Sequence, residues 1–193
     1  MAITTPTSLY HTTNTGTQFH YLQSGNQKGP LLLCLHGLGG SIDTYKPLLP
    51  YLPSDYNTLL VDFPGFGKSP FSASANTISI AHHVADLDNF ITALQRPSQP
   101  RGVVIIGHSL GAIVALQYAT LCPETVNGLA LLGAGRSAAE IPAAKQRMLD
   151  LAAAVREKGV AVAADLATKS NFYEPTYVCR IPLMPQTADK TNL

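Results

Sequence analysis

The chain has 193 residues, enough for one domain that buries roughly 70% of its unfolded surface. Hydrophobic residues make up 46% of it and charged residues 13%, which excludes disorder driven by charge and polarity. Thirteen Lys and Arg against twelve Asp and Glu leave a formal charge of +1, so there is no basic field to capture nucleic acid or an anionic membrane. The expected partner is therefore a small molecule of low charge.

Targeting and redox signals are absent from the sequence pattern. No apolar run approaches the about 18 residues that a membrane helix needs, and the Thr-rich residues 1–10 lack the pattern of a secretory signal. We therefore expect a soluble protein in the cytoplasm. Cys34, Cys122 and Cys179 are odd in number and too far apart for zinc spacing, which favours isolated thiols. We expect no metal and no other cofactor.

Short apolar runs alternate with helical patterns, an order typical of a mostly parallel sheet. The expected strands are Gln18 to Gln23, Leu31 to His36, Asn57 to Asp62, Gly102 to Gly107 and Val126 to Leu132. The middle three runs are almost continuously apolar, as strands buried on both faces must be. The sequence therefore predicts an α/β fold, a doubly wound and mostly parallel sheet with helices on both faces.

Three stretches have helical patterns. In the first, apolar residues recur at spacings of four and three, as on a helix that covers the sheet. These residues are Ile80, Val84, Leu87, Ile91 and Leu94. A second helix is expected from Ser109 to about Leu121, before Pro123. From Ser137 to Thr168 the chain is Ala-rich, and Gly159 should separate two further helices.

The first of these Ala-rich helices has an apolar face, formed by Ile141, Met148, Leu151 and Val155. This shift in composition divides the chain into a core, residues 1–135, a helical insertion, residues 136–178, and an irregular tail, residues 179–193.

The strongest chemical signal is Gly107-His108-Ser109-Leu110-Gly111, directly after an expected strand and before an expected helix. It fits G-x-S-x-G, in which a sharp turn holds the serine in a strained backbone with its Oγ exposed. Side chains at the two glycine positions would collide. The Leu110 N–H then lies at a helix N-terminus, where it can stabilise an oxyanion. The pattern predicts a nucleophile at Ser109, with a plain Gly-rich turn as the alternative.

Two further glycine loops follow expected strands. They are His36-Gly37-Leu38-Gly39-Gly40 and Asp62-Phe63-Pro64-Gly65-Phe66-Gly67-Lys68-Ser69. Each alone is compatible with an ordinary turn. All three motifs, however, lie at the carboxyl ends of strands, where open α/β sheets bind their ligands.

In this order and spacing, H-G-x-G-G, D-x-P-G-x-G-x-S and G-H-S-x-G resemble the motifs of the α/β-hydrolase fold superfamily, serine hydrolase type. The resemblance covers about residues 17–135 and implies that residues 136–178 begin a helical cap, or lid. It implies Ser109 as nucleophile and the N–H groups of Leu38 and Leu110 as the oxyanion hole. Related haloalkane dehalogenases and epoxide hydrolases use Asp at the elbow, and dienelactone hydrolases use Cys.

The chain departs from the family's triad, whose order is nucleophile, acid, histidine. All six histidines precede Ser109, so none has the usual position of the base. His36 is expected to be a hydrogen-bonded core or loop residue, and His108 to pack against the sheet. Asp189 is the candidate acid, although Pro185 would interrupt the strand before it, and a disordered tail is the alternative. The last strands are expected to be missing, as in a shortened gene product, a fragment or a degenerate paralogue.

Other candidate sites are rejected. His82 and His83 are placed on the polar face of a helix, where His82 and Asp86 would form a solvated pair. The run Gly67-Lys68-Ser69 lacks the earlier glycine of a phosphate-binding loop. The run from Gly133 to Ala138 fits G-x-G-x-x-A, but no acidic residue follows it at the end of a second strand.

Together these features predict a serine hydrolase that cleaves an ester, lactone, thioester or activated C–C bond of a small, largely apolar substrate. The alternative is a binding protein that keeps the pocket without catalysis. Neither nucleic acid nor a membrane is an expected partner. Val126 to Leu132 would be an apolar edge strand without Lys or Pro, through which the chain is expected to self-associate.

Overall fold

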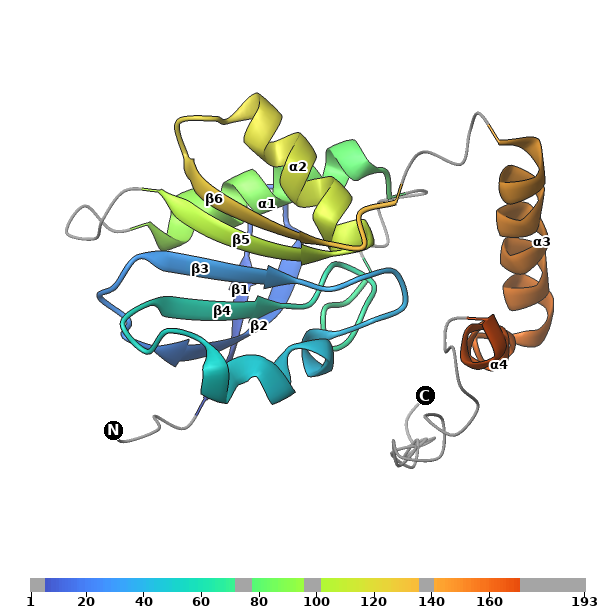
Figure 1. Ribbon diagram of the computed structural model, residues 1–193, viewed down its shortest axis with the longest axis horizontal. Helices are drawn as coiled ribbons and strands as arrows, with labels where there is room; N and C mark the ends of the chain where they lie inside the picture. The colour runs from blue at the N-terminus through green and yellow to red at the C-terminus, as the bar shows by residue number, and fades with distance from the viewer. Residues whose placement is uncertain (1–5, 72–77, 96–101, 136–140, 171–193) are drawn as a thin grey trace. The chain divides into compact units, whose positions relative to one another are not determined.

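The computed structural model describes residues 6–71, 78–95, 102–135 and 141–170, and the chain divides into two units, Met1–Gly135 and Arg136–Leu193. The first unit is built on a six-stranded mixed sheet (Figure 1). Its strands are β1 (Thr7–Thr12), β2 (Gln18–Gly25), β3 (Leu31–Leu35), β4 (Asn57–Val61), β5 (Val103–His108) and β6 (Val126–Leu132). They are ordered β1-β2-β4-β3-β5-β6, with the last four parallel and β2 antiparallel to both of its neighbours.

The predicted α/β class and all five predicted strands are confirmed, with strand ends shifted by no more than two residues. β1 was not predicted, because Thr7–Thr12 is short and mostly polar. Its hydrogen-bonding partner is β2, with Thr7 opposite Gln23 and Thr12 opposite Gln18. This strand therefore depends on pairing with a neighbour and not on an apolar pattern of its own.

Helices cover both faces of the sheet. On one face lie α1 (Ile80–Leu94) and α2 (Leu110–Leu121), and on the other lie two short 3-10 helices, η1 (Ile42–Thr44) and η2 (Lys46–Tyr51) (Figure 1). Side chains of β3 alternate between two cores: Leu33 packs with α1 and α2, whereas Cys34 packs with η1. A strand with both faces covered must be apolar throughout, and all five residues of Leu31–Leu35 are apolar and buried.

The second unit comprises α3 (Pro142–Lys158) and α4 (Ala161–Ser170), separated at Gly159, as predicted. No residue of α3 is buried, and Ile141 and Met148 of its predicted apolar face are about half exposed. Assignment of residues 136–178 to a lid stays a prediction, and the tail with Asp189 and Cys179 lies outside the described residues. None of the helices in the described ranges is long and apolar enough to cross a bilayer.

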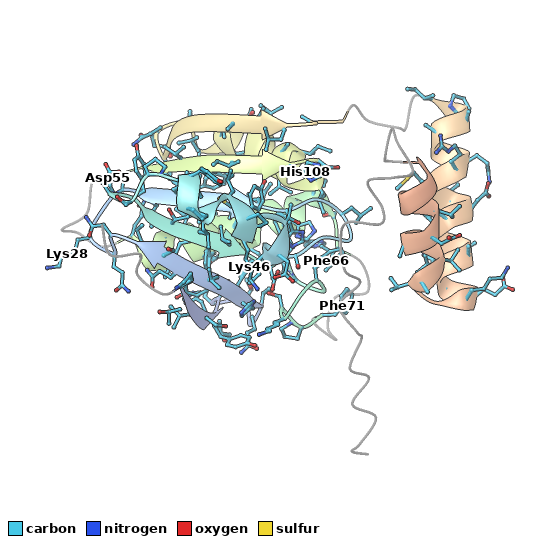
Figure 2. The ribbon with its side chains drawn as sticks, turned by 60° about the horizontal axis from the view of Figure 1, so that its bottom comes forward. Lys28, Lys46, Asp55, Phe66, Phe71 and His108 are labelled. Carbon is cyan, nitrogen blue, oxygen red and sulfur yellow. The ribbon has the colours of Figure 1, made fainter. Side chains whose placement is uncertain are left out.

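The parallel arrangement brings the ends of β3, β4 and β5 to one end of the sheet. His108, Phe66 and Phe71 lie there, while Lys28 and Asp55 lie at the opposite end (Figure 2). The three loops that carry the sequence motifs therefore start side by side.

Candidate active site

A single residue, Ser109, connects β5 to α2. It has φ 50° and ψ −109°, and it is the only non-glycine residue with a positive φ in the described part of the chain. Such a conformation costs energy for a residue with a side chain and persists only where the surroundings enforce it. Here the Ser109 N–H donates to the Leu132 carbonyl at 2.9 Å, and its own carbonyl accepts from Ala112 and Ile113 at 3.1 Å. Its hydroxyl does not cap α2.

The two glycines of the turn are required by close backbone contacts. A Cβ on Gly107 would lie 2.5 Å from the Gly111 carbonyl oxygen and 2.7 Å from the Ala112 Cα. A Cβ on Gly111 would lie 2.8 Å from the His36 carbonyl oxygen and closer still to that of Leu35. The Gly111 N–H donates to the His36 carbonyl at 3.1 Å, so α2 begins in direct contact with the end of β3. No larger residue fits at either position.

The loop after β3 lies against Ser109. A Cβ on Gly37 would lie 3.2 Å from the Ser109 Cβ, and the Gly40 N–H closes the turn by donating to the Gly37 carbonyl at 3.0 Å. Leu38 is in this turn, and Gly39 follows it with φ 76°. Leu110 is the first residue of α2, where amide N–H groups have no partner within the helix. The two N–H groups predicted for the oxyanion hole are thus both carried by segments that flank Ser109.

A cavity of about 440 Å³ opens beside these segments and includes Leu38 and Leu110 in its lining. Its other walls come from the loop after β4 and from the start of α1, and are mostly apolar: Pro64, Phe66, Phe71, Ile78 and Ile80. Gly65, a predicted loop residue, also lines it. This size and lining suit a small, largely apolar ligand.

His36 is a buried structural residue, as expected. The Phe63 N–H donates to its Nε2 at 3.0 Å, so its proton is on Nδ1, which donates to the Gly37 carbonyl at 2.7 Å. Burial lowers the pKa of His36, which keeps the ring neutral. Because both ring nitrogens bind backbone groups, His36 orients the loops after β3 and β4 and has no nitrogen left for a proton from Ser109.

Asp62 organises the loop after β4. Its carboxylate accepts from the Ile42 N–H at 2.7 Å, the Lys68 N–H at 3.0 Å and the His20 Nδ1 at 2.6 Å. A Cβ on Gly67, where φ is 54°, would collide with this carboxylate. The loop from Asp62 to Ser69 is therefore folded around a buried carboxylate, which agrees with the structural role expected for it.

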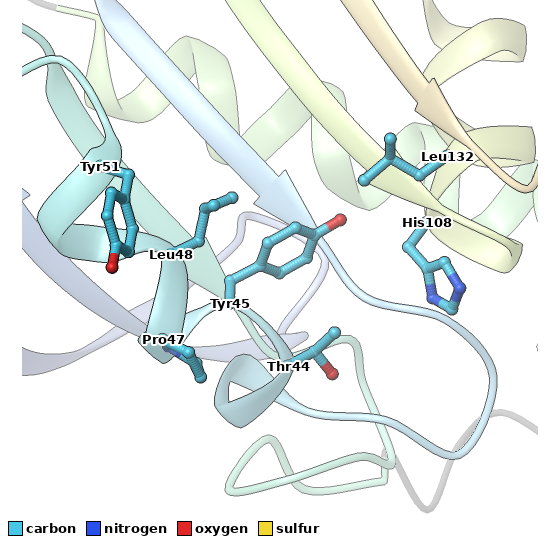
Figure 3. Close-up of a pocket in the computed structure, with 7 residues that line it drawn as sticks. All are labelled: Thr44, Tyr45, Pro47, Leu48, Tyr51, His108 and Leu132. Atoms are coloured by element: carbon cyan, nitrogen blue, oxygen red, sulfur yellow. The ribbon is translucent and has the colours of Figure 1, made fainter. Parts of the chain in front are cut away.

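His108 does not pack against the sheet, so that expectation was wrong. It is exposed and lines a second cavity of about 360 Å³, together with Tyr45, Leu48 and Leu132 (Figure 3). His108 is the last residue of β5, opposite Leu132 of β6. Burial of the neighbouring Tyr45 raises its pKa above the usual range.

His83 also departs from its prediction. It is only 5% exposed and packs against Phe63, with ring centroids 4.8 Å apart and the ring planes tilted by 52°. The spacing in the sequence could have indicated this burial, because position 83 is three residues after Ile80 and four before Leu87 and is therefore on the same helix face as these apolar residues. His82 is exposed, but its Nδ1 accepts from the Ser79 N–H at 3.1 Å in a capping box, and Asp86 accepts from the Thr15 hydroxyl. No ion pair joins His82 to Asp86.

Neither of the two cysteines in the described ranges, Cys34 and Cys122, is a reactive group of this site. Cys34 and Cys122 form no disulfide, and burial raises the pKa of Cys34 to about 12. A thiol with so high a pKa is a poor nucleophile at neutral pH.

The fold and the strained serine turn define an α/β protein of the hydrolase type. A family model described as the alpha/beta hydrolase fold matches residues 30–184, and the chain belongs to this family. It is 36% identical to the serine hydrolase-like protein of Danio rerio over 108 residues, 56% of this chain and 32% of the relative. It is 27% identical to epoxide hydrolase 4 of Mus musculus over 119 residues, 62% of this chain and 32% of the relative.

Among solved structures, a membrane phospholipase A, titled a bacterial virulence factor, has a TM-score of 0.59 and 28% identity, and the match covers 65% of this chain and 39% of that one. The chain thus spans about a third of the length of the curated relatives that it matches.

Proposed function

We propose that this chain carries the nucleophile and oxyanion hole of a serine hydrolase that acts on small, largely apolar acyl compounds: esters, lactones, thioesters or activated C–C bonds. The observation that carries the proposal is the backbone of Ser109, a strained conformation between β5 and α2 with a hydroxyl that the helix does not use. Strain of this kind is retained mostly at functional positions.

In the proposed reaction, Ser109 Oγ attacks the acyl carbon and forms a tetrahedral oxyanion that accepts from the Leu38 and Leu110 N–H groups. The bond to the leaving group then breaks, the leaving group takes the proton that the Ser109 hydroxyl gave up, and water hydrolyses the acyl-enzyme ester, returning a proton to Ser109 Oγ. A serine suits attack on a carbonyl. The relatives named epoxide hydrolases belong to a group that uses Asp at this position, so epoxide opening is not proposed for this chain.

Active-site labelling tests the nucleophile. A fluorophosphonate probe should label Ser109, and Ser109→Ala should lose both the label and any hydrolysis of p-nitrophenyl butyrate. Ser8→Ala is the matched control, because Ser8 Oγ lies 2.8 Å from His20 Nε2 and His20 in turn pairs with Asp62. This second Ser-His-Asp series starts from an exposed serine within strand β1, without the strained turn and the helix N-terminus found at Ser109, and should be inert. Label retained in Ser109→Ala, or lost in Ser8→Ala, would contradict the proposal.

The competing function is a receptor that binds a small molecule without turning it over. The apolar lining of the cavity beside Leu38 and Leu110 is compatible with it. The labelling experiment separates the two, since a receptor would bind acyl compounds in the cavity but leave Ser109 unmodified.

A further inference from the structure

A buried histidine outside the three sequence motifs, His20 of β2, contacts the loop after β4. The residue is 1% exposed, and its Nδ1 lies 2.6 Å from Oδ2 of Asp62. An ionised carboxylate only accepts hydrogen bonds, so the Nδ1 of His20 carries the proton of this bond. The Ser8 Oγ lies 2.8 Å from the other ring nitrogen, Nε2. Because a hydroxyl can donate or accept, Asp62 and not Ser8 decides where the proton of the ring is.

The two oxygens of the Asp62 carboxylate bind different segments. Oδ1 accepts from the Ile42 N–H at 2.7 Å, whereas Oδ2 accepts from His20 and, at 3.0 Å, from the Lys68 N–H. The terminal torsion of an aspartate has only a broad preference of its own, so hydrogen bonds decide how the carboxylate is turned. Since the carboxylate is planar, a strong bond at Oδ2 also fixes the direction of Oδ1. His20 therefore aims Oδ1 at Ile42.

The segment between β3 and η1, which carries Leu38, is held at both ends by residues that follow β4. At its start, the Phe63 N–H donates to the His36 ring at 3.0 Å, and at its end the Ile42 N–H donates to Asp62. An oxyanion-hole donor is effective only when it is held in place before the reaction. The position of the Leu38 N–H consequently depends on both of these anchors.

We infer that His20 is a positioning residue for the oxyanion hole, because it holds Asp62 in the orientation that anchors the segment of Leu38. The inference rests on the proposed function, in which the Leu38 N–H binds the oxyanion. His20 acts through Asp62 and Ile42 and not by contact with the substrate.

Replacing the ring should leave the main chain around it intact. The His20 N–H donates to Ser69 Oγ at 2.8 Å, and the His20 carbonyl accepts from the Asp62 N–H at 3.0 Å. These bonds do not involve the side chain, so a variant at this position loses the bond to the carboxylate and keeps the pairing of the segments.

Pre-steady-state acylation of Ser109 in the full chain tests the inference. Release of p-nitrophenol from p-nitrophenyl butyrate gives a maximal acylation rate and a half-saturating concentration. His20→Leu should lower the maximal rate by about 10-fold or more, part of the roughly 10²- to 10³-fold loss that follows removal of one oxyanion-hole donor. The half-saturating concentration should change by less than about twofold, because oxyanion contacts strengthen only in the transition state.

Two further variants separate positioning from general damage to the fold. His20→Asn supplies an amide N–H close to the place of Nδ1 and should restore most of the rate. Ser8→Ala leaves the bond between His20 and Asp62 in place and should react like the unmodified chain. The inference is overturned if His20→Leu acylates at the unmodified rate, or if His20→Asn is as slow as His20→Leu.

NMR of the unmodified chain covers the case in which His20→Leu does not fold. With ¹⁵N-labelled histidine, the Nδ1 of His20 should be protonated, and a proton on Nε2 alone would overturn the inference. The amide signals of Leu38 and Ile42 report on the segment without any reaction at Ser109. If these signals change in His20→Leu while the unmodified chain releases no p-nitrophenol, the proposed function alone is refuted.

Discussion

At the scale of single residues, the Asp62 carboxylate joins segments that are distant in sequence. It is 1% exposed and accepts hydrogen bonds from Ile42 at the start of η1, from Lys68 in its own loop and from His20 of β2. Ser69 extends the network, since its hydroxyl donates to the Asp62 carbonyl at 2.7 Å and accepts from the His20 N–H at 2.8 Å. Removing the carboxylate leaves several buried donors without an acceptor.

We therefore expect Asp62→Ala to lower the free energy of unfolding by about 3 kcal/mol or more, the usual result of removing one partner from a buried charged network. Urea denaturation measures it. Asp43→Ala is the control, because Asp43 is 66% exposed and its ion pair with Lys46 is solvated, so its loss should change stability little. Equal effects of the two substitutions would contradict the role assigned to Asp62.

Two buried histidines make stability depend on pH. Burial lowers the pKa of His36 and of His83 below the ordinary value of about 6.5. The unfolded chain therefore binds more protons than the folded one once the pH falls below about 6.5. The contribution of the two neutral histidines to the free energy of unfolding is complete above that pH and is lost as the pH falls below it.

The urea concentration at the midpoint of unfolding should consequently decrease as the pH is lowered from 7.5 to 5.5. Ordinary carboxylates titrate below this range, so they do not contribute to the change. His83→Phe should flatten the slope, because phenylalanine takes up no proton. His82→Gln, which removes an exposed imidazole of the same helix, should leave the slope unchanged. A flat profile in the unmodified chain would show that neither buried histidine titrates in this way.

At the scale of elements, the turn between β5 and α2 depends on backbone contact with β3. Gly111 approaches the carbonyl groups of Leu35 and His36, and no flexible side chain is available to move away. Gly128 of β6 differs, because a Cβ there would meet only the Val104 methyl groups at 3.8 Å. The two glycines therefore form a matched pair, one required by packing and one not.

Gly111→Ala should lower the free energy of unfolding by about 3 kcal/mol or more and abolish labelling of Ser109, since α2 must move to admit the methyl group. Gly128→Ala should be neutral or stabilising by about 0.5 kcal/mol, because alanine loses less chain entropy than glycine. Thermal and urea unfolding, read with the labelling assay, measure both. A stable and fully labelled Gly111→Ala variant would mean that the turn tolerates a side chain.

At the scale of the whole molecule, β6 forms one edge of the described sheet. It pairs with β5 alone, and Leu129, Leu131 and Leu132 are each more than a third exposed. An apolar edge with free N–H and C=O groups is a template for pairing with another chain. We propose that the 193-residue chain self-associates through β6.

Light scattering should then give a mass that rises with concentration. Leu131→Lys should lower it, because a charge on an edge strand opposes pairing. Leu121→Lys places the same charge on the exposed end of α2, where Leu121 is 63% exposed, and should leave association unchanged. A constant monomeric mass in the unmodified chain would refute the proposal.

Turnover by the same chain should be slow. Its six histidines all precede Ser109, and His36 has both nitrogens bonded, so His36 is not the base. A positioned base contributes on the order of 10²- to 10⁴-fold. Stopped-flow assays with p-nitrophenyl butyrate should give a rate lower by about that factor than that of an ordinary esterase. An ordinary turnover number would mean that one of the histidines before Ser109 in the sequence, other than His36, acts as the base.

Much of this molecule could be predicted from local patterns. Apolar runs predicted β2 to β6, periodic apolar residues predicted α1, and the elbow motif predicted the turn at Ser109. These features are local because a backbone conformation and a helix face depend on residues only a few positions apart. The strained backbone at Ser109 is also a local feature, because the glycines at positions 107 and 111, two residues to either side, predict the sharp turn.

Other features were decided by contacts between distant segments. β1 exists because β2 offers it a partner, and the sequence of Thr7–Thr12 has no apolar signal of its own. His83 is buried and His108 exposed, the reverse of their predictions, because the environment of a side chain depends on which loops pack over it. Phe63, after β4, packs against His83, whereas His108 lies beside Gly37 at the end of β5 and keeps an exposed side chain. Sequence by itself determined the backbone of the turn at Ser109, and tertiary packing decided which histidine faces the cavity beside it.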